Sequence, residues 1–272
     1  MKRVISATFI FFTMLNGKVF AQLETEDALP LAPGQVELGA AVEFQTSKEG
    51  TENAIPLAIE YGLSKRFTLL VEPVAYTNIN PKTGTSVTGF GDLEATLFYQ
   101  LLAETKGFPA VSLSAEIKLP TAKDSLIGTG KTDFTPFLIA SKTIGKFYTS
   151  ANLSYTFLGK PPGVTASNLF NYALGTLYEA SEKSILFAEI YGNTSALGGK
   201  DVPEGTINTS NAPELTGGEF VASIGYGYYL NNNLQLSFSI SYDNNNATLF
   251  RPGIVWTSHG GRNFFKKHFQ KN

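Results

Sequence analysis

The stretch Gln35-Val-Glu-Leu-Gly-Ala-Ala-Val-Glu-Phe-Gln45 alternates two kinds of side chain almost from end to end. The apolar set on one face of an extended chain is Val36, Leu38, Ala40, Val42 and Phe44, and the other face carries Gln35, Glu37, Ala41, Glu43 and Gln45. A helix would scatter both sets around its circumference, because its period is 3.6 residues. The stretch therefore predicts a β-strand with one apolar and one polar face.

Eleven further segments repeat this alternation along the chain. They cover about residues 54–62, 66–76, 91–102, 109–119, 133–142, 147–158, 168–179, 185–193, 219–230, 234–243 and 247–257. Most have the length of about 9 to 11 residues that a tilted strand needs to cross a bilayer. Strands of soluble proteins average about five or six residues.

The connections between these segments alternate between long and short. The first set is 46–53, 77–90, 120–132, 159–167, 194–218 and 244–246, and the second set is 63–65, 103–108, 143–146, 180–184 and 231–233. Long extracellular loops and short periplasmic turns are typical of outer-membrane barrels. The sequence thus predicts an all-β, antiparallel, up-and-down transmembrane β-barrel of about 12 strands over residues 35–257.

The ends of the chain predict the remaining domain organisation. A basic start at Met1-Lys2-Arg3, a short apolar run from Val4 to Leu15, and Val19-Phe20-Ala21 predict a cleavable signal peptide over residues 1–21. Residues 22–34 are expected to form a short periplasmic segment, and residues 258–272 a basic C-terminal tail. We accordingly expect no plug domain before the barrel.

Composition excludes several classes of function. The chain has no cysteine, so disulfides and thiolate metal sites are excluded. Removal of residues 1–21 would leave 18 Lys and Arg against 23 Asp and Glu, which disfavours nucleic acid as a partner. Both histidines, His259 and His268, lie in the tail, which excludes a Ser/His arrangement on the barrel wall. We therefore expect no enzymatic activity, no cofactor and no metal, although closely placed carboxylates leave glycosidase chemistry open.

The polar faces predict an acidic lumen, because charges are costly in hydrocarbon. The candidate lumen-lining residues are Glu37, Glu43, Glu60, Glu72, Glu94, Glu116, Lys118, Glu179, Glu189, Glu219 and Arg251. Two interpretations stay open: the carboxylates attract cations or polyhydroxylated solutes, or they hydrogen-bond with one another and fill a narrow barrel. We favour structural filling with a narrow path for small solutes.

The apolar faces are expected to meet lipid, with aromatic residues at the ends nearest the short turns. This predicted aromatic girdle consists of Tyr61, Phe67, Tyr99, Phe147, Tyr178, Tyr228 and Trp256. The simpler alternative is that Tyr and Phe are merely good strand formers.

A succession of glycines and acids marks the second quarter of the chain. It comprises Gly89, Gly91 and Asp92, then Pro120 at the end of Ala115-Glu-Ile-Lys-Leu-Pro-Thr121, then Gly128, Gly130 and Asp133. This succession resembles the family of outer-membrane transporters named for the meta-pathway of phenol degradation, over about residues 35–257. The resemblance implies an outer-membrane barrel that takes up small, aromatic or hydrophobic organic molecules. We interpret the motif residues themselves as architectural.

Two regions leave alternatives open. The last clear strand ends near Trp256, so either this residue is the terminal aromatic that the barrel assembly machinery reads, or the final strand is displaced toward Phe264, Phe265 and Phe269. The longest loop, Thr194 to Gly218, is either a recognition or plugging element or a flexible loop.

The function predicted from the sequence is an outer-membrane, porin-like transporter of a Gram-negative cell, which passes small organic solutes by diffusion. Its expected partners are membrane lipid, the solute and the barrel assembly machinery. The alternative is a non-transporting structural or adhesive barrel, in which a packed lumen supports surface loops.

Overall fold

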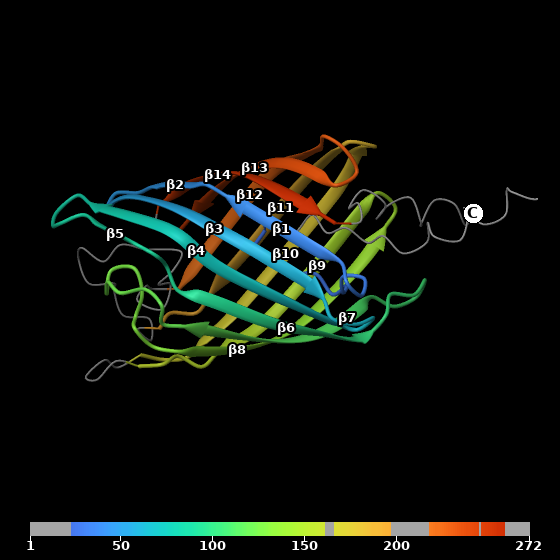
Figure 1. Cartoon of the computed structure of the whole chain (residues 1–272), viewed down its shortest axis with the longest axis horizontal. Helices are drawn as coiled ribbons and strands as arrows, with labels where there is room; N and C mark the ends of the chain where they lie inside the picture. The colour runs from blue at the N-terminus through green and yellow to red at the C-terminus, as the bar shows by residue number, and fades with distance from the viewer. Residues whose placement is uncertain (1–22, 161–165, 197–217, 245, 259–272) are drawn as a thin grey trace, which may run out of the picture.

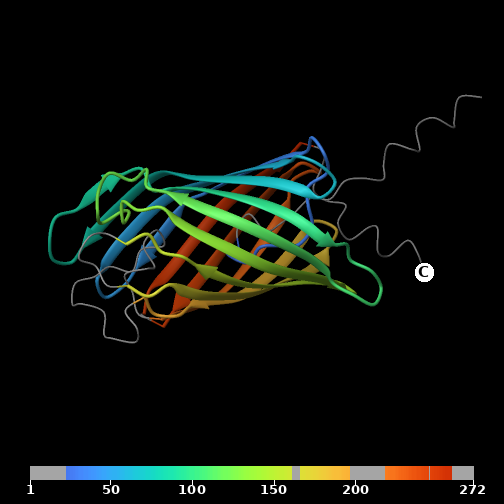
Figure 2. The same cartoon turned by 90° about the horizontal axis from the view of Figure 1, so that it is seen from below.

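The chain folds into a closed antiparallel β-barrel of the predicted 12 strands (Figures 1 and 2). The structure, a computed structural model, describes residues 23–160, 166–196, 218–244 and 246–258. The predicted signal peptide, most of the C-terminal tail and most of the loop from Thr194 to Gly218 lie outside these ranges. Among the described residues, no helix is long and apolar enough to span a membrane.

The described residues contain fourteen named strands. They are β1 (Val36–Ala41), β2 (Glu43–Thr46), β3 (Gly50–Gly62), β4 (Phe67–Pro81), β5 (Val87–Gly89), β6 (Leu93–Leu102), β7 (Ala110–Leu119), β8 (Asp133–Ile144), β9 (Phe147–Thr156), β10 (Leu169–Ser181), β11 (Ser184–Asn193), β12 (Glu219–Tyr229), β13 (Leu234–Asp243) and β14 (Thr248–Thr257).

Two of the barrel's strands are interrupted, which reconciles fourteen named strands with twelve in the barrel. β1 and β2 both pair with β3 and β14 and are separated only by Val42, whose N–H still donates to the Pro252 carbonyl at 3.0 Å. β5 and β6 both pair with β4 and are separated by residues 90–92. The Gly91 N–H donates across that interruption to the Val74 carbonyl at 3.0 Å.

Pairing of β1 with β14 closes the barrel. The register runs from Glu37 opposite Thr257 to Ala41 opposite Gly253. Closure leaves no unpaired edge, which is the condition under which a sheet can stand in hydrocarbon. The final strand therefore ends at Thr257 and is not displaced toward the tail.

Burial alternates along each strand as the period of two requires. In β13, Ser237, Ser239 and Ser241 are buried, whereas the intervening Phe238 and Ile240 are exposed. The serines are small polar groups on the inner face, and the large apolar side chains point outward. Lipid thus takes the place of a hydrophobic core on the outside of the wall.

Two predicted boundaries around the first extracellular hairpins differ from the structure. β3 begins at Gly50 and not at 54, so the predicted loop 46–53 shrinks to residues 47–49. β4 continues to Pro81 and pairs there with β5, which shortens the predicted loop 77–90 to residues 82–86. Both differences arise because the first extracellular hairpins are longer than the apolar stretches within them, and polar residues such as Asn78 and Asn80 can pair above the membrane.

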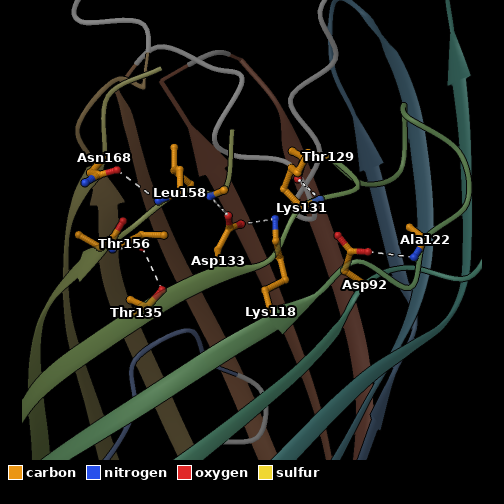
Figure 3. A network of polar contacts seen from close by, with 12 residues as sticks. Asp92, Lys118, Ala122, Thr129, Lys131, Asp133, Thr135, Thr156, Leu158 and Asn168 are labelled. Carbon is orange, nitrogen blue, oxygen red and sulfur yellow. Dashed lines mark hydrogen bonds and ion pairs between the residues drawn. The ribbon is translucent and has the colours of Figure 1, made fainter. Parts of the chain in front are cut away.

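Residues 23–32 are the main departure from the prediction. We expected a segment beside the periplasmic end of the barrel, but these residues lie inside it (dark blue trace in Figures 2 and 3). They contact inward side chains of strands all around the wall, among them Thr68 of β4, Ser141 of β8 and Glu189 of β11. No position outside the cylinder could reach these strands together.

Candidate functional site

A cavity of about 360 Å³ lies within the barrel between the N-terminal segment and the strands. Among the described residues, eight acids and one base line it. These are Glu24, Glu26, Glu43, Glu72, Glu94, Glu116, Glu219, Asp243 and Arg251. Six of the residues predicted to line the lumen are therefore brought together around one space, with two glutamates of the N-terminal segment added.

Three of these glutamates form an acidic wall on neighbouring strands. Glu72 of β4 lies directly opposite Glu94 of β6, and Glu116 of β7 lies opposite Thr96, two residues further along β6. Like charges directly opposite one another in a sheet are destabilising. Glu94 also lies opposite Lys118 of β7 on its other side, and all three glutamates line the cavity.

The cationic side of the cavity is a single arginine held by two acids. The Arg251 guanidinium lies 2.6 Å from a carboxylate oxygen of Glu43 and 2.8 Å from one of Glu24. Charge-assisted contacts of this length are strong and directional. Arg251 is thus bound to Glu43 and Glu24, while Glu72, Glu94 and Glu116 lie on other strands of the cavity wall.

The remaining predicted lumen residues lie apart from the cavity and have structural contacts. Glu37 is buried and accepts a hydrogen bond from Thr257 Oγ1 at 2.9 Å, across the closing seam. Glu189 is buried and accepts from the backbone N–H and the Oγ1 of Thr25 at 3.1 and 2.9 Å. Glu60 is buried and Glu179 is half-buried.

Asp92 shows what the family motif does (Figure 3). Its carboxylate accepts a hydrogen bond from the Ala122 N–H at 2.9 Å and so fastens the start of the loop after β7. A Cβ at Gly128 would lie 2.6 Å from Asp92 Oδ2, and a Cβ at Gly89 would lie 3.1 Å from Ile127 Cδ1. The loop of residues 120–132 can therefore pack closely on β5 and β6 only with glycines at these positions.

The second half of the motif is an ion pair at the same end of the barrel (Figure 3). Lys118 Nζ lies 2.6 Å from Asp133 Oδ2, and both side chains are buried. Asp133 Oδ1 also accepts from the Gly159 N–H at 2.7 Å, which ties the loop after β9 to β8. Lys118, which was predicted to line the lumen, forms this pair. Gly130 adopts a left-handed conformation with φ of 68° in the loop, and Pro120 lies directly after β7.

The predicted aromatic girdle lies at the ends of strands beside the short turns. Tyr61, Phe67, Phe147, Tyr228 and Trp256 are exposed on the outer face. Tyr99 and Tyr178 are half-buried because their rings pack against Phe67 and Phe147, with centroids 4.8 and 4.9 Å apart. This placement is the one that a headgroup-level belt requires.

A second aromatic belt at the opposite end was missed in the sequence. Its exposed members are Phe44, Tyr76, Phe134, Tyr155, Phe157, Phe170, Phe220, Tyr242 and Phe250. Phe134 and Phe157 stack with ring centroids 6.2 Å apart. The sequence contains the signal for this belt, because each of these residues lies at the loop end of an apolar strand face. The predicted girdle covered only the strand ends beside the short turns.

Glu24 and Glu26 were also missed, since residues 22–34 were placed outside the barrel. The available signal was the acidic run Glu24-Thr-Glu-Asp27 on the N-terminal side of the first strand. Within the part of the chain that the structure describes, no group of three or more His, Asp or Glu is placed to hold a metal ion.

The fold and this interior define a class of protein: a β-barrel of the bacterial outer membrane. More narrowly, the chain belongs to the family "Putative MetA-pathway of phenol degradation", whose model matches residues 29–256. Comparison with curated proteins found no match.

Two solved porins share the fold at low sequence identity. The KdgM porin in complex with disordered oligogalacturonate matches with a TM-score of 0.53 and 9% identity, over 82% of this chain and 99% of that one. The NanC porin matches with a TM-score of 0.54 and 10% identity, over 80% of this chain and 98% of that one.

Proposed function

We propose that this protein is an outer-membrane channel through which small organic solutes diffuse, with a preference for neutral or cationic ones. The observation that carries the proposal is the cavity of about 360 Å³ inside the barrel, whose wall holds Glu72, Glu94 and Glu116 side by side. Rings of carboxylates attract cations and repel anions in channels. Membership of the family supports uptake of organic molecules.

The acidic lining of the cavity makes the solute held by the KdgM porin an unsuitable solute for this channel. The KdgM porin holds oligogalacturonate, which is a polyanion. A lining of eight acids and one base among the described residues opposes such a solute by direct repulsion. Transport of a neutral or cationic molecule is consistent with this lining, and no step of bond making or breaking is required of it.

The test is the ion selectivity of the purified barrel in planar bilayers under a salt gradient. The variant is the double change Glu72→Gln and Glu116→Gln, which removes two charges while keeping side-chain volume. We expect cation selectivity for the unmodified protein and reduced selectivity for the variant.

A matched control removes the same charge elsewhere. Glu49 and Glu182 lie in connections outside the cavity lining, so the double change Glu49→Gln and Glu182→Gln should leave selectivity unchanged. Anion selectivity of the unmodified protein, or equal effects of the two double variants, would contradict the proposal.

A second candidate function is a non-transporting scaffold or adhesin. The N-terminal segment inside the lumen favours it, because a filled barrel can stiffen surface loops without conducting. The same recordings separate the two functions, since a scaffold conducts in neither form and its glutamine variants change only thermal stability.

A further inference from the structure

The N-terminal segment crosses the lumen in contact with most of the barrel wall. Leu23 packs against Tyr148, Leu177 and Tyr229, on β9, β10 and β12. At the other end of the segment, the Leu31 N–H donates to Thr68 Oγ1 of β4 at 3.0 Å. All these wall residues lie toward the short turns, so the segment spans the periplasmic half of the barrel and forms the floor of the cavity.

Side chains of the wall, and not strand pairing, hold the middle of the segment. The Ala28 carbonyl accepts from Ser112 Oγ at 2.7 Å and from Gln100 Nε2 at 3.3 Å, and its N–H donates to Ser141 Oγ at 2.8 Å. Asn152 accepts from the Glu26 N–H at 2.7 Å and donates to the Glu26 carbonyl at 2.9 Å. Such contacts satisfy buried backbone groups, but water can replace each of them in an open lumen.

The ion pair between Glu24 and Arg251 does not by itself hold the segment in the lumen. The side chain of Glu24 is 45% exposed, and its partner Arg251 keeps Glu43 at 2.6 Å if Glu24 leaves. Arg251 is therefore not orphaned by an outward movement. Glu24 and Glu26 also add negative charge to the cavity that already holds the acidic wall, and this repulsion opposes their stay.

A tight turn joins the segment to the barrel. The Gly34 N–H donates to the Gly62 carbonyl at 2.8 Å, and the Gln35 N–H donates to the Ala32 carbonyl at 2.9 Å. Gly34 has a φ of 76°, in the left-handed region that favours glycine. This turn fixes one end of the segment at the start of β1, so residues 23–31 can leave the lumen without disturbing the wall.

We infer that residues 23–32 are an internal gate, which closes the periplasmic half of the lumen and leaves it when a solute passes. The inference rests on the channel proposed above. In this arrangement Glu24 and Glu26 belong to both the gate and the solute cavity, so a cationic solute that pairs with them competes directly with the contacts that keep the gate shut.

A reversible covalent lock tests the gate. Thr25 Cβ lies 2.9 Å from a Cβ built at Gly175, and the three nearest atoms to that Cβ all belong to Thr25. The double change Thr25→Cys and Gly175→Cys therefore places two thiols within a small shift of disulfide geometry. The chain has no other cysteine that could compete.

The matched control is a disulfide within the wall. Thr149 and Thr176 are opposite one another on β9 and β10, with their hydroxyl oxygens 3.1 Å apart. The double change Thr149→Cys and Thr176→Cys links two strands without touching the segment. Conductance of both pairs is recorded in bilayers before and after reduction.

For the Thr25→Cys and Gly175→Cys variant, we expect the conductance to rise about tenfold or more when the disulfide is reduced. The disulfide holds the segment in the lumen, so the open state is populated only after reduction. The control pair should change little. Equal conductance of the oxidised and reduced Thr25 and Gly175 pair overturns the gate but leaves the channel proposal standing.

A second variant opens the gate without a disulfide. Ala28 is 1% exposed among Leu70, Phe98 and Ile139, so Ala28→Glu should expel the segment and raise conductance above that of the unmodified protein. Pro33→Glu places the same charge at an exposed position directly after the segment and should not raise the conductance. If neither the unmodified protein nor any variant, including Ala28→Glu, conducts ions, both the gate and the channel proposal are wrong.

Discussion

Individual residues show how the requirements of packing differ from those of function in this barrel. Gly91 stands where β5 passes into β6, and its Cβ would lie 2.6 Å from Val74 Cβ. Asp92 next to it fastens a loop by one hydrogen bond. These residues hold the wall and its loops together, whereas Glu72 and Glu94 face one another against electrostatic cost. The motif that carries the family resemblance is therefore structural, and the candidate site lies elsewhere.

Gly91→Ala tests the structural role of the motif. We expect a loss of about 1–3 kcal/mol in the free energy of unfolding, because the added methyl overlaps a branched carbon that cannot rotate away. The measurement is urea unfolding of the folded barrel in detergent or lipid. Gly107→Ala is the control, since a Cβ there has no atom within 4 Å. Equal stability of the two variants would show that β4 and the β5–β6 junction are not closely packed.

Along each strand, side chains that face lipid alternate with side chains that face the interior. The sequence reveals this alternation more directly than any other property of the barrel. Leu97 lies near the middle of β6 and is 43% exposed, while its neighbours Thr96 and Phe98 are buried. Ile144 is 65% exposed and ends β8 beside a short turn. The depth of a position in the bilayer, and not its exposure alone, should determine the energetic cost of placing a charged side chain there.

Leu97→Arg should cost about 2–4 kcal/mol in the free energy of folding into a bilayer, because the charge lies near the midplane. Ile144→Arg should cost only about 0–1 kcal/mol, because its side chain reaches the headgroups. Folding titrations into lipid vesicles measure both. Similar costs at the two positions would place the hydrocarbon region differently along the strands.

The whole molecule depends on closure between its first and last strands. β14 pairs with β13 on one side and with β1 and β2 on the other. Loss of β14 would expose two strand edges to hydrocarbon, where unpaired backbone groups are very costly. Within the described residues, the pairing of β14 with β1 ends at Thr257.

Truncation after Asn246 should therefore abolish the barrel, whereas truncation after Ser258 should retain it. The readout is the different migration of folded and heat-unfolded protein on an SDS gel, together with protease resistance in vesicles. A folded barrel from the shorter chain would contradict closure through β14, and failure of the longer one would assign a folding role to residues 259–272.

The strand number, the inner and outer faces of the strands and the family follow from the sequence alone. A period of two and a strand length near the membrane thickness are local properties, so residues 35–45 and their eleven successors reveal them without tertiary information. The positions of Glu72, Glu94 and Glu116 on inner faces follow from the same alternation.

Which of these acids share one cavity, and which segment lies inside the barrel, depend on contacts between distant parts of the chain. Lys118 had the pattern of a lumen residue, but its pairing with Asp133 depends on the register between β7 and β8. Residues 23–32 have no strand periodicity, and the partners of their backbone, such as Ser112, Ser141 and Asn152, come from distant strands. Those polar side chains meet only after the barrel has closed around them, so the strand periodicity did not indicate that the lumen is occupied.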